Sequence, residues 1–424
     1  MALSKYDVVV CGGGPGGIGA ALGAARAGAK TLLIERYGFL GGGATAMLVN
    51  PFMTFHAGGQ QIIFGVLQDM IAKMQSMEGY GSPKAPYAFD PEVFKIAAEE
   101  LCQEAGVELL YHAFLAGAQT DSNGRIRSIE IATKSGLMTL AAPMFVDSTG
   151  DADLAAFAGA QIEKGRPEDG LSQPMTLNFR MARVDAARVP SRQQITDRYI
   201  AAKERNELQC PRENVLWFFT TEPDVIHFNT TRVVMKDATD AQQLTEAEVE
   251  ARRQAWQIAQ FLRREIPGFE NAYLQSTAVQ IGVRESRRVM GEYLLSAEDC
   301  LAARKFDDCI TRGSYSVDIH NPAGTGTIIK RIPPGEWYDI PFRSLIPKGF
   351  KNLLIGGRSI SSTHEAHSAI RVMPIVFGIG QAAGVAAAMC ADCALDPREL
   401  PIRRLQETLV QQGQRLAKDW LKEA

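Results

Sequence analysis

The glycine-rich stretch "CGGGPGGIGAA" at residues 11–21 constrains the fold of this chain more than any other feature. It follows the short apolar segment "YDVVVCG" and opens an alanine-rich segment that favours a helix from Gly17 to Ala29. "KTLLIER" at residues 30–36 then predicts a second strand just after the helix closes at Gly28. Strand, glycine turn, helix and strand in this order predict a right-handed βαβ unit, which starts a doubly wound sheet.

The glycines have the spacing G-x-G-x-x-G, and each position has a physical purpose. Gly12 allows the tight turn, Gly14 lets the backbone approach a pyrophosphate, and Gly17 lets the helix pack closely on the strand. Glu35 ends the second strand, where a carboxylate can accept hydrogen bonds from ribose hydroxyls and would repel a 2′-phosphate. The sequence therefore predicts a dinucleotide site, and this element alone leaves both NAD and FAD open.

The remaining segments predict an α/β fold, with a Rossmann-like domain and a second, mainly antiparallel β domain with helices. We expect helices at 64–75, 186–207, 245–265 and 374–391. A further helix is expected to begin at Asp90 as N-cap, with Pro91 at the first helical position, and to end before Gly106. Thr245 and Glu248 indicate a capping box for the helix at 245–265. Strands are expected at 107–115, 125–133, 174–183, 214–235 and 352–358, and a strand, turn and helix at 144–159. The predicted domains are 1–165 (cofactor domain), 166–335 (substrate or cap domain) and 336–424 (return to the cofactor domain).

Composition excludes some classes of partner and places the protein in the cytoplasm. The formal net charge of −3 offers no basic field for nucleic acid or an anionic membrane surface. The chain starts without a signal peptide pattern, and its alanine-rich segments are too short to span a bilayer. Seven scattered cysteines are typical of reduced thiols, and Cys390 and Cys393 lie in an expected helix interior.

Several longer motifs resemble the FAD-dependent oxidoreductase family related to fumarate reductase and succinate dehydrogenase flavoproteins. They are "ERYGFLGGGAT" (35–45), "FVDSTGDADLAAFAGA" (145–160), "GVRESRRVMGEYLLSAED" (282–299), "YDIPFRSLIPKGFKNLLIGGRSIS" (338–361) and "THEAHSAIRVMPIVFGIGQAAGVAAA" (363–388). The resemblance implies FAD, covalent or not, lying extended along the first domain. The residues implied to hold it are Gly12, Gly14, Pro15, Gly16, Gly17, Glu35, Arg36, Gly42, Gly43, Ala44, Thr45, Leu115, Thr149, Gly150, Asp151, Gly357, Arg358 and Met373.

The helix that starts at Pro374 is expected to aim its N-terminus at the flavin. A helix dipole contributes about 0.3–2 kcal/mol to a nearby negative charge. The helix would therefore shift the reduction potential of the flavin, but it would not determine which reaction the flavin carries out.

Candidate catalytic residues fall in two segments. "GVRESRRVMGEY" carries Arg284, which suits a carboxylate through bidentate contacts or braces a domain interface. "SSTHEAHSAIRVMP", expected as a loop, carries His364, His367 and Arg371, with His320 as a possible neighbour for acid–base work near neutral pH. A zinc site needs H-E-x-x-H, but His364 and His367 are three apart, so no metal is expected. His56 and His227 are further candidates for the flavin or substrate face, and His112 is interpreted as structural.

These observations predict an FAD-dependent oxidoreductase that exchanges a hydride between flavin and a small, anionic organic substrate. His364 or His367 would take the accompanying proton, and Arg371 or Arg284 would fix the anionic group. Oxidation of an alcohol, amine or acid and reduction of an activated double bond are both open, and so are the electron partner and the oligomeric state. The alternatives are a flavin-dependent monooxygenase that uses dioxygen and a flavin-binding interaction protein without enzyme activity.

Overall fold

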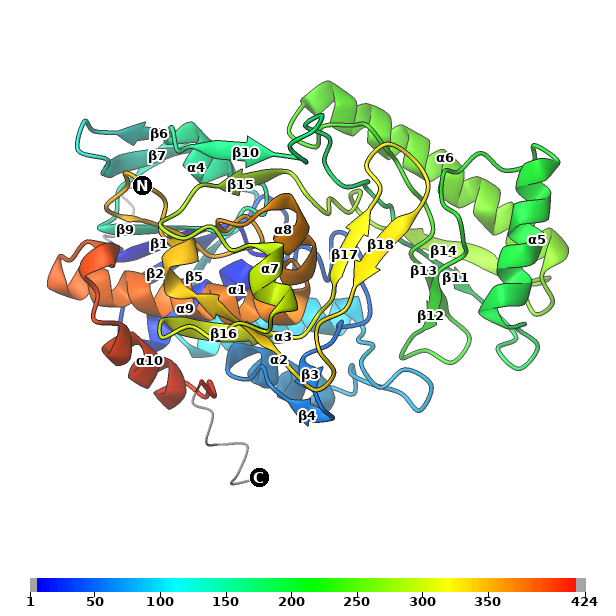
Figure 1. Ribbon diagram of the computed structural model, residues 1–424, viewed down its shortest axis with the longest axis horizontal. Helices are drawn as coiled ribbons and strands as arrows, with labels where there is room; N and C mark the ends of the chain where they lie inside the picture. Colours follow the sequence, from blue (N-terminus) through cyan, green and yellow to red (C-terminus); the bar gives the residue numbers. More distant parts are fainter. Residues whose placement is uncertain (1–5, 417–424) are drawn as a thin grey trace.

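Residues 6–416 are described in the computed structural model, and their centre is a five-stranded parallel sheet (Figure 1). Its order is β20-β9-β1-β2-β5, formed by β1 (Val8–Cys11), β2 (Thr31–Ile34), β5 (Glu108–Leu110), β9 (Met144–Asp147) and β20 (Leu353–Ile355). Every residue of β1, β2, β9 and β20 is buried, as expected for strands covered on both faces. The predicted α/β fold with a doubly wound sheet is confirmed.

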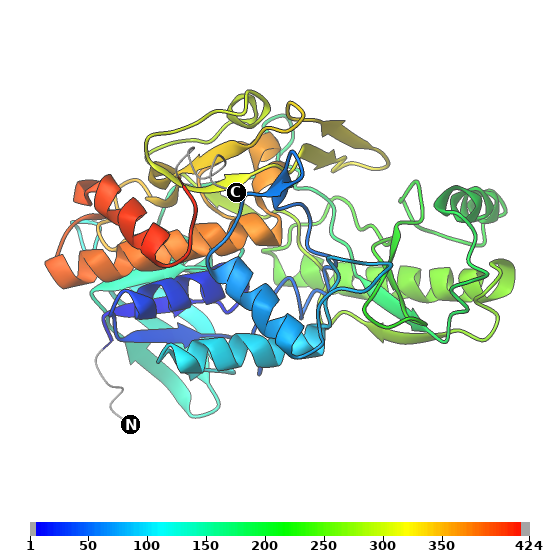
Figure 2. The same cartoon turned by 90° about the horizontal axis from the view of Figure 1, so that it is seen from below.

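Helix α1 (Pro15–Arg26) lies along helix α9 (Met373–Cys393), blue beside orange in Figures 1 and 2. The two backbones can touch because α9 presents glycines, which have no side chain, to α1. A Cβ on Gly380 would lie 1.9 Å from the carbonyl oxygen of Gly16, and a Cβ on Gly384 would lie 1.9 Å from the carbonyl oxygen of Ala20. Within residues 6–416, α9 is the one helix long and apolar enough to cross a membrane, and 94% of its most apolar window is buried inside the protein. It is therefore placed as a core helix.

Further elements complete the first core. They are α2 (Val66–Ser76), α3 (Pro91–Glu104), α4 (Asp153–Phe157), α10 (Ile402–Gln411), the small pair β3 (His56–Ala57) and β4 (Gln60–Gln61), and the sheet β6 (Phe114–Thr120), β7 (Ile126–Thr133) and β8 (Gly136–Leu140). The Asp90 side chain accepts from the backbone N–H of Glu92 at 2.7 Å, which confirms the predicted cap of α3. The strand predicted at 107–115 is wrong as one element, because His112 has a φ of 53° and divides it between two sheets.

A second core contains the antiparallel sheet β12-β13-β11-β14, shown in green in Figure 1. Its strands are β11 (Phe179–Ala182), β12 (Trp217–Phe219), β13 (Ile226–Phe228) and β14 (Tyr273–Thr277), and its helices are α5 (Arg192–Glu204) and α6 (Ala241–Glu265). The predicted capping box at Thr245 is wrong: Asp240 caps α6 by accepting from Gln243 N–H at 2.8 Å. Thr245 lies inside the helix and donates to the carbonyl oxygen of Ala241 at 2.7 Å.

The other elements of the first core are short strand pairs and two short helices. They are β10 (Ile162–Lys164) with β15 (Arg287–Val289), α7 (Ala297–Leu301), β16 (Cys309–Gly313) with β19 (Tyr338–Pro341), the hairpin β17 (Val317–His320) with β18 (Thr327–Lys330), and α8 (His364–Ile370). The expectation of a loop around His364 is wrong, because Thr363 caps α8 by accepting from Ala366 N–H at 3.2 Å.

The domain boundaries at 165/166 and 335/336 stay a prediction. The second core draws on residues 175–283 together with Leu48, while buried apolar residues from Val289 onward belong to the first core. The chain start, on which the signal-peptide prediction rests, and the end of the segment 336–424 lie outside the described residues. All seven cysteines are free thiols, and Cys393 is the exposed one.

Candidate functional site

Three cavities run from the carboxyl ends of β1 and β2 toward the second core. The first, of about 50 Å³, is lined by residues that include Glu35, Leu115 and Asp153. The second, of about 110 Å³, shares Gly12, Glu35, Arg36 and Thr149 with the first. The third, of about 350 Å³, shares Gly43, Met47, Arg358, Arg371 and Met373 with the second. The shared lining residues place the three cavities next to one another in a row, called the track below.

The glycine turn borders the second cavity on the side that no other segment of the described chain covers. Gly12 has a φ of +98°, and a Cβ there would lie 2.6 Å from the carbonyl oxygen of Ser148. A Cβ on Gly17 would lie 1.7 Å from the carbonyl oxygen of Gly12, so this position permits only glycine. A Cβ on Gly14 would meet no protein atom closer than the Cα of Gly42 at 3.9 Å. The space beside Gly14 is therefore left for something other than protein.

Backbone amides orient the carboxylate of Glu35. Its Oε2 accepts from Gly13 N–H at 2.6 Å, and its Oε1 accepts from Tyr37 N–H at 2.9 Å. The side chain borders both the first and the second cavity. Glu35 is thus fixed where the sequence predicted an acceptor for ribose hydroxyls.

The turn after β9 is built on a buried aspartate. Asp147 accepts from the N–H and hydroxyl of Thr149 at 3.0 and 2.7 Å, and from Ala155 N–H at 2.9 Å. Burial raises the pKa of Asp147 against these hydrogen bonds, which lower it. The turn places Thr149 and Gly150 at the second cavity, so the carboxylate of Asp147 contributes to the site by fixing the conformation of this loop.

Most of the predicted cofactor residues line the track. Fourteen do so: Gly12, Gly14, Pro15, Gly16, Glu35, Arg36, Gly42, Gly43, Leu115, Thr149, Gly150, Gly357, Arg358 and Met373. Gly17, Ala44, Thr45 and Asp151 line none of the three cavities. Asp151 instead accepts from Arg358 Nη2 at 2.8 Å and from the hydroxyl of Ser286 at 2.6 Å, so it positions a residue that does line the track.

The third cavity, called the arginine cavity below, is lined by Arg212, Arg284 and Arg371 from three distant segments. Arg284 donates only to neutral acceptors: Pro174 O at 2.7 Å, Thr176 Oγ1 at 2.5 Å and Asn229 Oδ1 at 3.2 Å. Arg371 donates to the carbonyl oxygens of Ser368 and Asp318, both at 3.4 Å. Within residues 6–416, none of these three arginines forms an ion pair within 4.0 Å.

Positive charge is in excess in the arginine cavity. Its two carboxylates are Glu213, which pairs with the buried Arg232 at 3.1 Å, and Asp318, which accepts from the hydroxyl of Tyr315 at 2.8 Å. Burial lowers the pKa of Arg284 well below its ordinary value, and the neighbouring Arg371, Arg212 and Arg232 lower it further. Because like charges are held together out of water, an anion would relieve the repulsion.

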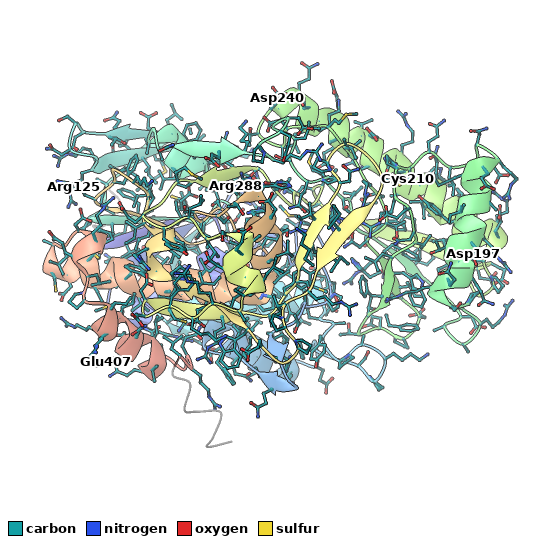
Figure 3. The ribbon with its side chains drawn as sticks, in the orientation of Figure 1. Arg125, Asp197, Cys210, Asp240, Arg288 and Glu407 are labelled. Atoms are coloured by element: carbon teal, nitrogen blue, oxygen red, sulfur yellow. The ribbon has the colours of Figure 1, made fainter. Side chains whose placement is uncertain are left out.

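The histidines predicted to handle protons lie behind the wall of the arginine cavity and do not line it. His364 Nδ1 donates to Glu285 Oε1 at 2.9 Å, and Glu285 is also bonded to Arg288, which Figure 3 labels on β15. His367 Nε2 donates to the carbonyl oxygen of Arg284 at 3.0 Å, and burial lowers the pKa of His367 to about 3. This placement makes both histidines supports for the segment that carries Arg284.

The remaining candidates divide in the same way. His320 lines the arginine cavity, whereas His56 and His227 do not. Sequence reasoning missed Arg212, Tyr315 and Asp318, which carry no motif and reach the cavity only through the tertiary fold. Within the described part of the chain, no group of three or more His, Cys, Asp or Glu side chains is placed to hold a metal ion.

The parallel sheet, the glycine turn with Glu35 and the second core are typical of a two-lobed dinucleotide-binding protein. The chain belongs to the FAD dependent oxidoreductase family, whose model matches residues 7–409. It is an FAD-dependent oxidoreductase and a flavoprotein.

Curated relatives match only part of the chain. The soluble pyridine nucleotide transhydrogenase of Pseudomonas aeruginosa (strain LESB58) is 30% identical over 156 residues, which cover 35% of this chain and 32% of that protein. The transhydrogenase of Salmonella paratyphi B (strain ATCC BAA-1250 / SPB7) is 58% identical over 40 residues, 9% of each chain. The matches therefore span about a third or less of these relatives.

Solved structures match over more of the chain at low identity. A geranylgeranyl bacteriochlorophyll reductase-like protein from Thermoplasma acidophilum is 12% identical with a TM-score of 0.48, covering 97% of this chain and 85% of that one. The p-nitrophenol 4-monooxygenase of Pseudomonas putida is 13% identical with a TM-score of 0.40, covering 68% and 70%.

The residues present fit FAD. The three cavities of the track share lining residues, and the glycine turn leaves room for a pyrophosphate beside Gly14. Arg358 at the second cavity keeps a buried Nε without a hydrogen-bond partner among the described residues. Leu115 and Glu35 would hold the adenosine end, the glycine turn and Gly150 the pyrophosphate, and Gly43, Arg358 and Met373 the flavin end.

Proposed function

We propose that this oxidoreductase exchanges a hydride with a small organic carboxylate bound in the arginine cavity. The observation that carries the proposal is the excess of guanidinium groups there: Arg212, Arg284 and Arg371 line the cavity without ion pairs of their own among the described residues. FAD, when bound, supplies the hydride exchange itself. The chain must therefore bind the carboxylate, orient it and move the accompanying proton.

Orientation is assigned to the arginines. A guanidinium group meets a carboxylate through two parallel N–H donors, so a pair of them fixes both its position and its plane. Arg284 is itself held by three neutral acceptors, which spares its charge for the substrate. Apolar side chains such as Leu216, Phe218 and Val283 line the same cavity and reduce the access of water.

Proton transfer is assigned to side chains that line the cavity in place of His364 and His367. The Asp318 carboxylate accepts from the Tyr315 hydroxyl at 2.8 Å and keeps further lone pairs that can take a proton, while burial raises the pKa of Tyr315 and keeps it a donor. The same pair would accept a proton in substrate oxidation and return one in the reduction of an activated double bond, as in fumarate reductases. The proposal allows either direction of the reaction. It includes the relation to fumarate reductase flavoproteins that the motifs indicate, and a cytoplasmic location.

Flavin reduction under anaerobic conditions tests the proposal. The holoprotein is mixed with small carboxylates and with their neutral amides, and the flavin absorbance is followed. We expect one or more carboxylates to bleach the oxidised flavin or to reoxidise chemically reduced flavin, their amides to be inactive, and Arg284→Met to raise KM roughly tenfold or more, as loss of a charge-assisted hydrogen bond predicts. Arg127→Met, at a side chain 63% exposed, is the matched control and should behave as wild type.

A different pattern would favour the monooxygenase alternative. If NADH alone bleaches the flavin rapidly, no carboxylate either bleaches the oxidised flavin or reoxidises the reduced flavin without dioxygen, and Arg284→Met changes nothing, the proposed dehydrogenase or reductase is wrong. A protein that holds FAD but responds to neither would favour the non-enzymatic alternative.

A further inference from the structure

We infer that His320 is a fixed hydrogen-bond donor in the arginine cavity, and that the substrate carries, besides its carboxylate, an oxo oxygen that accepts from His320 Nε2–H. The inference rests on the proposed function of the cavity and deepens it. The proposed substrate or product is therefore a small oxo acid, and not an amino acid or an unsubstituted alkanoate.

The hairpin β17–β18 brings His320 to the cavity. His320 pairs with Thr327 and Asp318 with Ile329 across the hairpin, and all four residues line the cavity. Residues two apart on a strand, and their antiparallel partners, share one face of the sheet. In Figure 1 this yellow hairpin stands between the parallel sheet and the green second lobe. His320 is not among the residues that the arginine cavity shares with the second cavity, so it lies at the substrate end.

Arg232 determines which ring nitrogen of His320 carries the proton. Its Nη2 lies 3.2 Å from His320 Nδ1, and a guanidinium group has only N–H donors. The Thr327 hydroxyl, 3.1 Å from the same Nδ1, can either donate or accept, whereas the guanidinium can only donate. We therefore take Nδ1 as the acceptor, which leaves the proton of the neutral ring on Nε2. Arg232 cannot turn away, because its Nη1 donates to the carbonyl oxygens of Gly324 and Gly326 at 3.1 and 3.3 Å and pairs with Glu213.

Nε2 is free to meet a ligand. The described residues offer it Asp318 Oδ2 at 3.6 Å, which is longer than a hydrogen bond. A His–Asp arrangement that used His320 as a base would need an open Nδ1, but Nδ1 faces Arg232. The geometry therefore makes His320 a donor and excludes it as the proton acceptor.

The charges around His320 keep the ring neutral. Burial lowers its pKa, and Arg284, Arg371, Arg212 and Arg232 lower it further. The carboxylates that face it are Asp318 near Nε2 and Glu213, which is paired with Arg232. Four cations against two carboxylates leave no stabilisation for an imidazolium ion, so the donor persists across the physiological pH range.

Nitrogen NMR tests the tautomer directly. In holoprotein labelled with ¹⁵N-histidine, we expect the His320 signals, assigned from their absence in His320→Gln, to remain those of the neutral Nε2–H tautomer from about pH 5.5 to 8.5. Titration to imidazolium with an ordinary midpoint of about 6.5, or a proton on Nδ1, would overturn the inference. This readout needs no substrate and no turnover.

Binding tests the substrate class. The probes are 2-oxo acids of three to five carbons and the alkanoates of matched length, titrated calorimetrically into the holoprotein. We expect wild type to bind the oxo acid about 3- to 10-fold more tightly, which corresponds to one net hydrogen bond. His320→Leu should abolish the preference, and His320→Gln, which keeps an N–H donor, should retain part of it.

The outcomes separate the two proposals. Equal affinity of wild type for both probes, or an unchanged preference in His320→Leu, overturns the oxo-acid assignment while the anion site stands. If no carboxylate binds, the proposed function of the cavity fails, and with it the assignment of a substrate oxygen. The NMR result still decides the tautomer of His320 in that case.

Discussion

Replacing Gly14 by valine separates cofactor binding from folding. Gly14 has extended backbone angles, φ −73° and ψ −176°, which any residue adopts. Its Cβ would meet only the Cα of Gly42, at 3.9 Å, so the new side chain projects into the second cavity without displacing protein atoms. The fold should survive, at a cost of about 1 kcal/mol for a less suitable N-cap residue.

Binding of FAD should suffer much more. The valine side chain holds the pyrophosphate away from the amides at the start of α1, and one charge-assisted hydrogen bond contributes about 1.5–3 kcal/mol. The Kd for FAD should therefore rise roughly 10- to 150-fold. The assays are titration of apoprotein with FAD, the flavin released on denaturation of purified protein, and urea unfolding of the apoprotein.

Two further glycines calibrate the result. Gly17→Ala places a Cβ 1.7 Å from a backbone oxygen and should unfold the protein outright, whereas Gly324→Ala meets no atom within 4 Å and should match wild type. The reasoning is refuted if Gly14→Val binds FAD with wild-type affinity. It is equally refuted if the variant loses FAD only together with its fold, as Gly17→Ala does.

Three further predictions concern stability, measured by urea denaturation. Glu285→Gln removes the buried ion-pair partner of Arg288 and leaves it only the half-exposed Glu163 at 3.8 Å, so it should cost about 3–5 kcal/mol, whereas an unchanged midpoint would contradict the pairing. His367 has a folded pKa of about 3, below the unfolded value of 6.5, so its contribution is present above pH 6.5 and is lost as pH falls. Wild type should lose about 1.4 kcal/mol per pH unit below pH 6.5 relative to His367→Gln, and parallel profiles would refute this. Gly384→Val puts a Cβ 1.9 Å from Ala20 O and should cost more than about 4 kcal/mol, and soluble wild-type-like protein would contradict the contact.

Local signals predicted much of the fold. The glycine turn and the Asp90 cap are short-range patterns whose physics is complete within a few residues, and both form as expected. The predicted Thr245 cap failed because Asp240 starts the same helix one turn earlier, and both residue types are good caps. The break at His112 gave no signal, since a single residue with positive φ is not marked by residue type there.

The candidate site was less predictable because it is assembled from distant parts of the chain. Arg212, Arg284 and Arg371 share one cavity only after both lobes have formed. A histidine looks the same in a sequence whether it lines a cavity, as His320 does, or lies behind its wall, as His364 does. Burial and hydrogen-bond partners decide its role, and both are tertiary properties.

The contact between α1 and α9 has a consequence for the biosynthesis of this protein. The ribosome makes the phosphate-binding turn first, but α9 and β20, which cover α1 and complete the parallel sheet, come from the last quarter of the chain. Until Gly380 and Gly384 have emerged, the side of α1 that packs on α9 stays uncovered, and long-range pairings of this kind fold slowly. The nucleotide-binding motif of a nascent chain therefore stays incompletely packed for most of translation. A protein truncated before Met373 would expose apolar surface and would lack a complete cofactor site.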